Sequence, residues 1–217
     1  MKGLPAVVVA LAALIVGVYL VEAVSVGARE ALFHALAVIP ARFQPGPDAF
    51  HSPVEALGPV FGHALLHDAP WPLHVMMNML IYLQIGGLLY GRFDETGGGA
   101  WRFLAFFFGS AAASAAAYIL INPGSEIPAV GASGAICGMF AGYLLGARRN
   151  WRQALGDPAI RRMGFWFLFI NVGLAALARI TGFLPIAWEA HLGGFVGGVL
   201  LFPFLAPRRA AFAGPWG

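Results

Sequence analysis

Four polar side chains stand within apolar stretches of this sequence, and their types fit the chemistry of acyl transfer. Ser133 lies between glycines in "GASGA", His191 lies in "EAHLGGFVGG", and His74 and Asn78 lie four residues apart in "HVMMN". A serine hydroxyl becomes a strong nucleophile when an imidazole takes its proton, so Ser133 and His191 could form a nucleophile and base pair. On a helix, His74 and Asn78 would share one face, from which both could donate hydrogen bonds to an oxyanion.

The surroundings of the two reacting groups predict a dyad. The backbone N–H of Ser133 would be free at a helix N-terminus and could supply a third donor to the oxyanion. Glu189 precedes His191 by two positions, and on a helix that spacing turns the two side chains to nearly opposite faces. No carboxylate is therefore well placed to make a triad.

The composition predicts that these residues are positioned by helices in a membrane. Hydrophobic residues make up 59% of the 217 residues and charged residues only 11%, with a mean hydropathy of +0.77. That leaves too little polar surface to cover a soluble globule of this size. The 13 cationic residues are scattered in short groups, so no basic stripe indicates nucleic acid as a partner.

Six apolar runs approach the roughly 20 residues that a helix needs to cross a bilayer. They cover residues 4–24, 73–90, 103–121, 133–147, 164–184 and 186–205. The first run is long for the core of a signal peptide, and a poor cleavage site follows it, so we expect it to remain as a span. The sequence predicts an all-α membrane protein, a six-transmembrane-helix bundle that forms a single domain over residues 1–217.

The distribution of cationic side chains predicts the orientation of this bundle. If the six spans alternate, one side receives Lys2, Arg92, Arg102, Arg148, Arg149, Arg152, Arg161, Arg162, Arg208 and Arg209, and the other only Arg29, Arg42 and Arg179. The cation-rich side should be cytoplasmic, with both termini in it. The predominance of arginine over lysine is typical of a GC-rich bacterial genome, so we expect a bacterial inner (plasma) membrane. The outer first loop, residues 25–72, contains a short amphipathic segment that we expect to lie in the membrane interface.

The polar residues of the second, fourth and sixth runs are predicted to lie at one depth. Counted back from cytoplasmic arginines at ~1.5 Å per residue, Asn78 lies roughly 21 Å, Ser133 roughly 22 Å and His191 roughly 25 Å away. The fourth run is too short to bridge ~30 Å from Ser133, so residues 128–132 must dip into the bundle. Irregular backbone at that depth must be buried or line water, which predicts an outward-facing polar cavity with Ser133 at its floor.

Purely structural roles for the same residues stay open. Glycines recur every four residues in the fourth and sixth runs, and such seams commonly serve only close helix packing; they include Gly134, Gly138, Gly194 and Gly198. Ser133 could be one more small residue in a seam, and Asn78 or a lone buried histidine could make only interhelical hydrogen bonds. The coincidence of three polar clusters on three helices at one depth favours catalysis.

The remaining histidines and the lone cysteine give no sign of a metal or a cofactor. His63 and His67 are spaced like a metal pair, but "HALLH" lacks the glutamate of a zincin motif. We expect them to make polar contacts that hold the loop above the cavity. A single cysteine, Cys137, excludes an intrachain disulfide and a cysteine-based zinc cluster.

The motifs resemble those of one known family. "GASGAICG", "HVMMN" and "AHLGGFVGG" are similar to the GxSG, HxxxN and HxxGxxxG motifs of rhomboid intramembrane serine proteases, in the family's order and on the second, fourth and sixth expected helices. The resemblance implies a six-helix fold, Ser133 as nucleophile, His191 as base, and His74 and Asn78 as oxyanion donors. The chain departs from many rhomboids at Cys137, where they carry an aromatic residue, and its first loop lacks the Trp-Arg pair of some members.

The expected function is that of a serine endopeptidase of the rhomboid type. It would hydrolyse a peptide bond in or near transmembrane segments of membrane-protein substrates in the lipid bilayer, without a metal or a cofactor. One alternative is a catalytically inactive, rhomboid-like binder of transmembrane clients. Another is a histidine-based metal transporter, which is weakened because few membrane carboxylates accompany the histidines.

Overall fold

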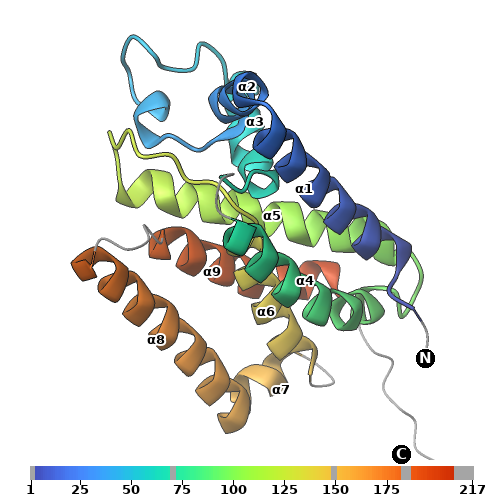
Figure 1. Ribbon diagram of the computed structural model, residues 1–217. Coiled ribbons are helices and arrows are strands. Elements are labelled where there is room, and N and C mark those ends of the chain that lie inside the picture. The colour runs from blue at the N-terminus through green and yellow to red at the C-terminus, as the bar shows by residue number, and fades with distance from the viewer. Residues whose placement is uncertain (1–2, 69–71, 148–150, 182–186, 208–217) are drawn as a thin grey trace, which may run out of the picture.

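The described residues form a bundle of helices. The computed structural model describes residues 3–68, 72–147, 151–181 and 187–207 (Figure 1). Within those ranges the only β-type pairing is an isolated bridge between Val38 and Ala129. The predicted all-α class is therefore confirmed for the part of the chain that is described.

Six helices correspond to the six predicted apolar runs: α1 (Ala6–Val24), α4 (Pro72–Phe93), α5 (Gly99–Ile121), α6 (Ser133–Gly146), α8 (Pro158–Thr181) and α9 (Trp188–Leu205). The connection after α1 holds α2 (Val26–Leu36), η1 (Pro40–Phe43), α3 (Pro53–Gly62) and η2 (His63–Leu65), and α7 (Trp151–Gly156) precedes α8. Four helices, α1, α4, α5 and α9, are long and apolar enough to cross a membrane, and α6 is apolar but shorter.

Helix α8 begins before the predicted apolar run. The apolar run begins at Gly164, because Arg161 and Arg162 were assigned to the preceding connection, yet the helix begins at Pro158. Asp157 caps it, since its Oδ1 accepts the backbone N–H of Ala159 at 2.8 Å. A cap followed by proline at the first helical position is a strong start signal, and it outweighs the two charges of the first turns. Residues 182–184 of the predicted run lie outside the described residues.

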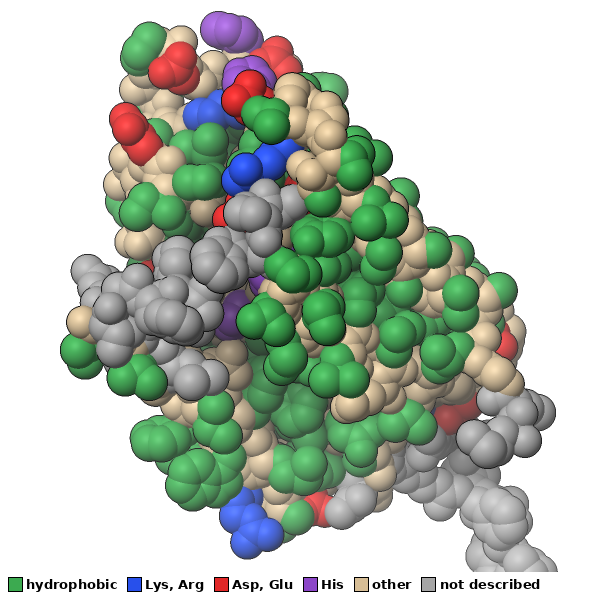
Figure 2. Space-filling view, in the orientation of Figure 1, with side chains coloured by type: hydrophobic (Ala, Val, Ile, Leu, Met, Phe, Trp, Pro, Cys, Tyr) green, Lys and Arg blue, Asp and Glu red, His purple; other side chains and the backbone are tan. Residues whose placement is uncertain are grey.

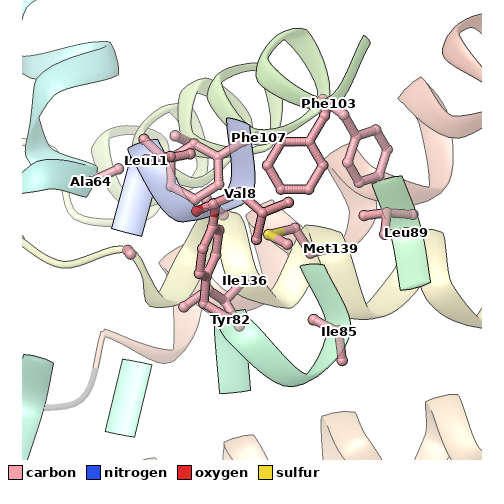
Figure 3. Close-up of a cluster of buried hydrophobic side chains, with 14 of the residues drawn as sticks. Val8, Leu11, Ala64, Tyr82, Ile85, Leu89, Phe103, Phe107, Ile136 and Met139 are labelled. Atoms are coloured by element: carbon pink, nitrogen blue, oxygen red, sulfur yellow. The ribbon is translucent and has the colours of Figure 1, made fainter. Parts of the chain in front are cut away.

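The short helix α6 lies at the centre of the bundle, next to α4, α5 and α9 (Figure 1). Most of its side chains are buried, and α8 lies to one side of the other helices. On the side of the bundle away from α8, an apolar core lies between α1, α4, α5 and α6 and includes Phe103, Phe107 and Met139 (Figure 3). Within it the Tyr82 hydroxyl donates to the Val8 carbonyl oxygen at 3.0 Å, which ties α4 to α1.

Glycines let α6 approach its neighbours. A Cβ at Gly194 of α9 would overlap the carbonyl oxygen of Gly134 of α6, and a Cβ at Gly198 would overlap that of Gly138. On the side facing α5, the missing Cβ atoms of Gly134 and Gly138 leave room for the side chains of two serines there. Backbones this close require glycine, so the seam holds Ser133 and the helix that carries His191 in contact.

Hydrophobic side chains dominate the surface. Figure 2 shows them over much of one face, while charged side chains gather toward the end formed by the first connection and at the opposite end. Large exposed hydrophobic residues occur on α1, α4, α8 and α9, among them Leu14, Leu80, Phe165 and Phe204. An apolar surface of this extent needs a nonaqueous environment. Of the cations that determine the predicted orientation, Lys2, Arg148, Arg149, Arg208 and Arg209 lie outside the described residues.

Candidate active site

Ser133 is the first residue of α6, and the backbone before it is bent to put it there. Gly131 adopts φ +119°, a conformation that other residues rarely adopt. A Cβ at Gly131 would lie 2.8 Å from the His74 ring and 3.8 Å from Ser133 Oγ. Glycine therefore lets the chain turn beneath His74 and enter α6 with the Ser133 hydroxyl half-exposed.

His191 lies in the first turn of α9 and meets Ser133 directly. Its Nε2 is 2.8 Å from Ser133 Oγ, across 58 residues of sequence. Both residues are half-buried. A hydroxyl and an imidazole at this distance can exchange a proton, which is the geometry that a serine nucleophile and its base require.

The other ring nitrogen of His191 has a partner that the sequence analysis missed. Nδ1 of His191 is 2.9 Å from Oδ1 of Asn171, which lies in the middle of α8. The Asn171 amide also donates from Nδ2 to the carbonyl oxygen of Phe167 at 2.8 Å. Glu189 is buried on the same helix as His191 and has no hydrogen bond to it. The hydrogen-bond partner of the imidazole Nδ1 is thus an uncharged amide rather than a carboxylate.

His74 and Asn78 lie on the first turns of α4, and the His74 ring lies near Ser133. The Nε2 atom of His74 and the Oγ atom of Ser133 both face the position that a Cβ of Gly131 would take. Asn78 is buried at 6% exposure, and its Nδ2 donates to the backbone oxygen of His74 at 2.9 Å. The amide nitrogen has a second hydrogen that can reach another acceptor. The structure therefore brings the four singled-out polar residues to one region.

His63 and His67 attach the first connection to the backbone around Ser133. The N–H of Gly131 donates to the carbonyl oxygen of His63 at 2.9 Å, and the N–H of Ala132 donates to Nε2 of His67 at 3.3 Å. Nδ1 of His63 donates to the Pro59 carbonyl oxygen at 2.9 Å. These contacts agree with the predicted role of the pair in holding the loop. Within the described residues, no three His, Cys, Asp or Glu side chains gather as metal ligands would.

Burial keeps both loop histidines uncharged. Desolvation lowers the pKa of His63 to about 4 from its ordinary 6.5. Desolvation, together with the nearby His74, lowers the pKa of His67 to about 3. A neutral His67 keeps a lone pair on Nε2, which the Ala132 N–H needs as its acceptor.

A buried carboxylate supports this loop from α1, and the sequence analysis missed it as well. Glu22 is 2% exposed, and its Oε2 accepts the backbone N–H of His67 at 3.1 Å. Beside it, Arg29 and Asp68 form an ion pair at 2.6 Å. A carboxylate near the end of an apolar run is costly to bury without a partner, and that cost was the signal available in the sequence.

Cys137 lies one helical turn after Ser133 and is buried, at 5% exposure. It therefore fills space within the helix bundle as a small hydrophobic side chain would. Two hollows on the described surface lie away from Ser133 and His191: one between α6 and α8, lined by Phe140, Arg162, Met163, Trp166, Phe167 and Ile170, and one around Arg92. The polar cavity above Ser133 remains a prediction.

Comparison with known proteins identifies the kind of domain that carries this geometry. The family model described as the Rhomboid domain matches residues 54–208, which include Ser133, His191, His74 and Asn78. A search of curated proteins gives no match.

Proposed function

The chain belongs to the rhomboid family and is an integral membrane protein, and from that premise we propose that it is an active intramembrane serine protease. The observation that carries the proposal is the 2.8 Å approach of His191 Nε2 to Ser133 Oγ. Rhomboid proteins are typically intramembrane serine proteases, and inactive members exist, so the proposal depends on these two side chains.

The proposed reaction begins at the Ser133 hydroxyl. As Oγ attacks the carbonyl carbon of the scissile peptide bond, its proton passes to Nε2 of His191. The tetrahedral intermediate collapses when His191 returns that proton to the leaving amine, which leaves an acyl-enzyme on Ser133. Water then attacks the ester with His191 again as base. His191 returns the proton to Oγ, which releases the acid product and restores the Ser133 hydroxyl.

The developing oxyanion needs donors that are fixed before the reaction. The His74 ring faces the same point as Ser133 Oγ, and Asn78 has a second amide hydrogen one turn along the same helix. The backbone N–H of Ser133, at the start of α6, has no acceptor within its helix. We assign these three donors to the oxyanion.

The proposed substrates are transmembrane segments of other proteins, and the proposed site opens toward the outer face. In this arrangement α6 and α8 join the four long apolar helices as spans, and the first connection lies outside. Both termini are then cytoplasmic, in a bacterial inner membrane. A reporter fused after Gly217 should be cytoplasmic and a tag near Asp48 accessible from outside, whereas the opposite result would overturn this orientation.

The test of the function is cleavage by the purified, detergent-solubilised protein. Incubation with a panel of fluorescent transmembrane peptides should yield fragments with the wild type but not with Ser133→Ala or His191→Gln. A metal chelator should leave cleavage unchanged. Absence of cleavage by the wild type in detergent and in liposomes would instead support an inactive binder of transmembrane clients, and inhibition by the chelator alone would favour a metal-dependent function.

A further inference from the structure

We propose that Asn171 is a positioning residue that fixes the tautomer and the orientation of His191, so that α8 completes a serine–histidine–asparagine relay. This inference deepens the proposed protease function and rests on it. It concerns a residue outside the three sequence motifs, on α8, which lies to one side of the bundle (Figure 1).

The hydrogen bonds of Asn171 determine which atom faces His191. Its Nδ2 donates to the Phe167 carbonyl oxygen at 2.8 Å, which leaves Oδ1 toward the imidazole at 2.9 Å from Nδ1. A carbonyl oxygen can only accept, so Nδ1 of His191 carries the hydrogen. In a neutral imidazole the other nitrogen, Nε2, is then the acceptor, and the Ser133 hydroxyl must donate to it. That is the direction of transfer that attack by Ser133 requires.

Aromatic stacking holds α8 where this bond can form. The Phe167 ring stacks on Phe140 of α6 with centroids 4.3 Å apart, and on Phe195 of α9 with centroids 5.6 Å apart. Phe167 lies one turn before Asn171, and Phe195 lies one turn after His191. The three rings therefore join the three helices beside the relay and set the distance between the amide and the imidazole.

Removal of the amide should affect the chemical step more than binding. With Asn171→Ala, His191 can rotate or take the other tautomer, so we expect kcat to fall about tenfold or more with little change in KM. Asn171→Asp keeps the acceptor and should restore most of kcat. Its added carboxylate stabilises the protonated imidazole, so the acidic limb of the pH profile of kcat/KM should move to higher pH.

A matched control separates this role from helix stabilisation. The Nδ2 atom of Asn122 donates to the Tyr118 carbonyl oxygen at 3.1 Å, the same kind of bond to its own helix but with no imidazole beyond it. Asn122→Ala should leave kcat and the pH profile unchanged. If Asn171→Ala does not fold, the pH profile of Asn171→Asp still tests the proposal.

A spectroscopic measurement tests the inference independently of cleavage. In protein labelled with ¹⁵N-histidine, with the His191 signals assigned by their loss in His191→Gln, the wild type should show a protonated Nδ1, and Asn171→Ala should show a mixture or the other tautomer. A wild-type protein that shows the protonated Nδ1 but cleaves no peptide would overturn the proposed function but not the role of Asn171. A wild-type kcat in Asn171→Ala, an unchanged tautomer, or failure of Asn171→Asp to rescue or to shift the pH profile would overturn the role of Asn171.

Discussion

Gly194 of α9 lies against the backbone carbonyl oxygen of Gly134 of α6, so closely that a Cβ at position 194 would overlap that oxygen. Gly134 directly follows Ser133, and Gly194 lies on the turn after His191. The contact between two glycine backbones therefore sets the separation of the two helices at the level where the hydroxyl and the imidazole meet.

Gly194→Ala should impair both stability and cleavage. The added methyl group has only backbone to displace, so α6 and α9 must move apart, at a cost of about 1–3 kcal/mol of unfolding free energy. The 2.8 Å contact between Ser133 and His191 should lengthen with them, and the rate of peptide cleavage should fall steeply. Thermal unfolding and cleavage assays on the same preparation measure both effects.

Gly173→Ala is the control for that variant, because no atom of the described residues lies within 4 Å of a Cβ added at this position on α8. It should keep wild-type stability and cleavage. If Gly194→Ala behaved in the same way, the glycine contact would not be what positions the two side chains.

The helices could be predicted from the sequence because each apolar run approaches the length of a span. Five of the six helices both begin and end within about one helical turn of the predicted run. The start of α8 differed from the prediction although its signal, Asp157 followed by Pro158, is present in the sequence, because the charges at 161 and 162 interrupt the apolar pattern there. The arrangement of short helices in the first connection depends on long-range contacts, such as the bridge from Val38 to Ala129, that no local pattern encodes.

The residues of the site were only partly predictable. Ser133, His191, His74 and Asn78 could be found because polar groups in apolar runs are costly and therefore stand out. Asn171 carries the same signal, but the partner expected for the imidazole was a carboxylate. Which ring nitrogen of His191 the Asn171 side chain faces depends on how α8 packs against α9, and that is a property of tertiary structure.

Loss of an oxyanion donor should lower kcat without weakening substrate binding. Asn78→Ala and His74→Ala should each reduce kcat by about 10²-fold or more, because the donors act on charge that develops only in the transition state. Steady-state kinetics on a transmembrane peptide provides kcat and KM. The matched control is Met77→Ala, an exposed position on the same helix. Equal, small losses in all three variants would argue against an oxyanion role.

Stability should fall as the pH falls below about 6.5, because His63 and His67 are buried in the neutral form. Their pKa values are about 4 and about 3 in the folded protein and near 6.5 when exposed, so between these values the unfolded chain binds more protons. Each histidine should then contribute up to ~1.4 kcal/mol of lost stability per pH unit, and this stabilisation is fully present above pH 6.5.

Thermal unfolding in detergent from pH 7.5 to pH 5 measures this dependence. His67→Gln should flatten the slope, while His51→Gln, at an exposed position in the first connection, should not change it. A wild-type melting temperature that stays level across the range would contradict the buried neutral state of the two histidines.

Cys137 should prove dispensable for cleavage. The residue is 5% exposed, so Cys137→Ala removes one sulfur atom from a packed helix and should retain activity, slowed at most severalfold. A small alkylating agent should leave the wild type active, because a buried thiol is poorly accessible. Complete loss of activity in a stable Cys137→Ala, together with inactivation by the alkylating agent, would transfer the nucleophilic role from Ser133 to Cys137.

The most direct test of the catalytic account is to locate the residue that a fluorophosphonate modifies. The purified protein should be treated with the reagent, digested and mapped by mass spectrometry, with Ser133→Ala, His191→Gln and Cys137→Ala treated in parallel. The account predicts one adduct on Ser133, absent from Ser133→Ala and from His191→Gln but present in Cys137→Ala. An adduct elsewhere, or one on Ser133 that persists undiminished in His191→Gln, would contradict activation of Ser133 by His191.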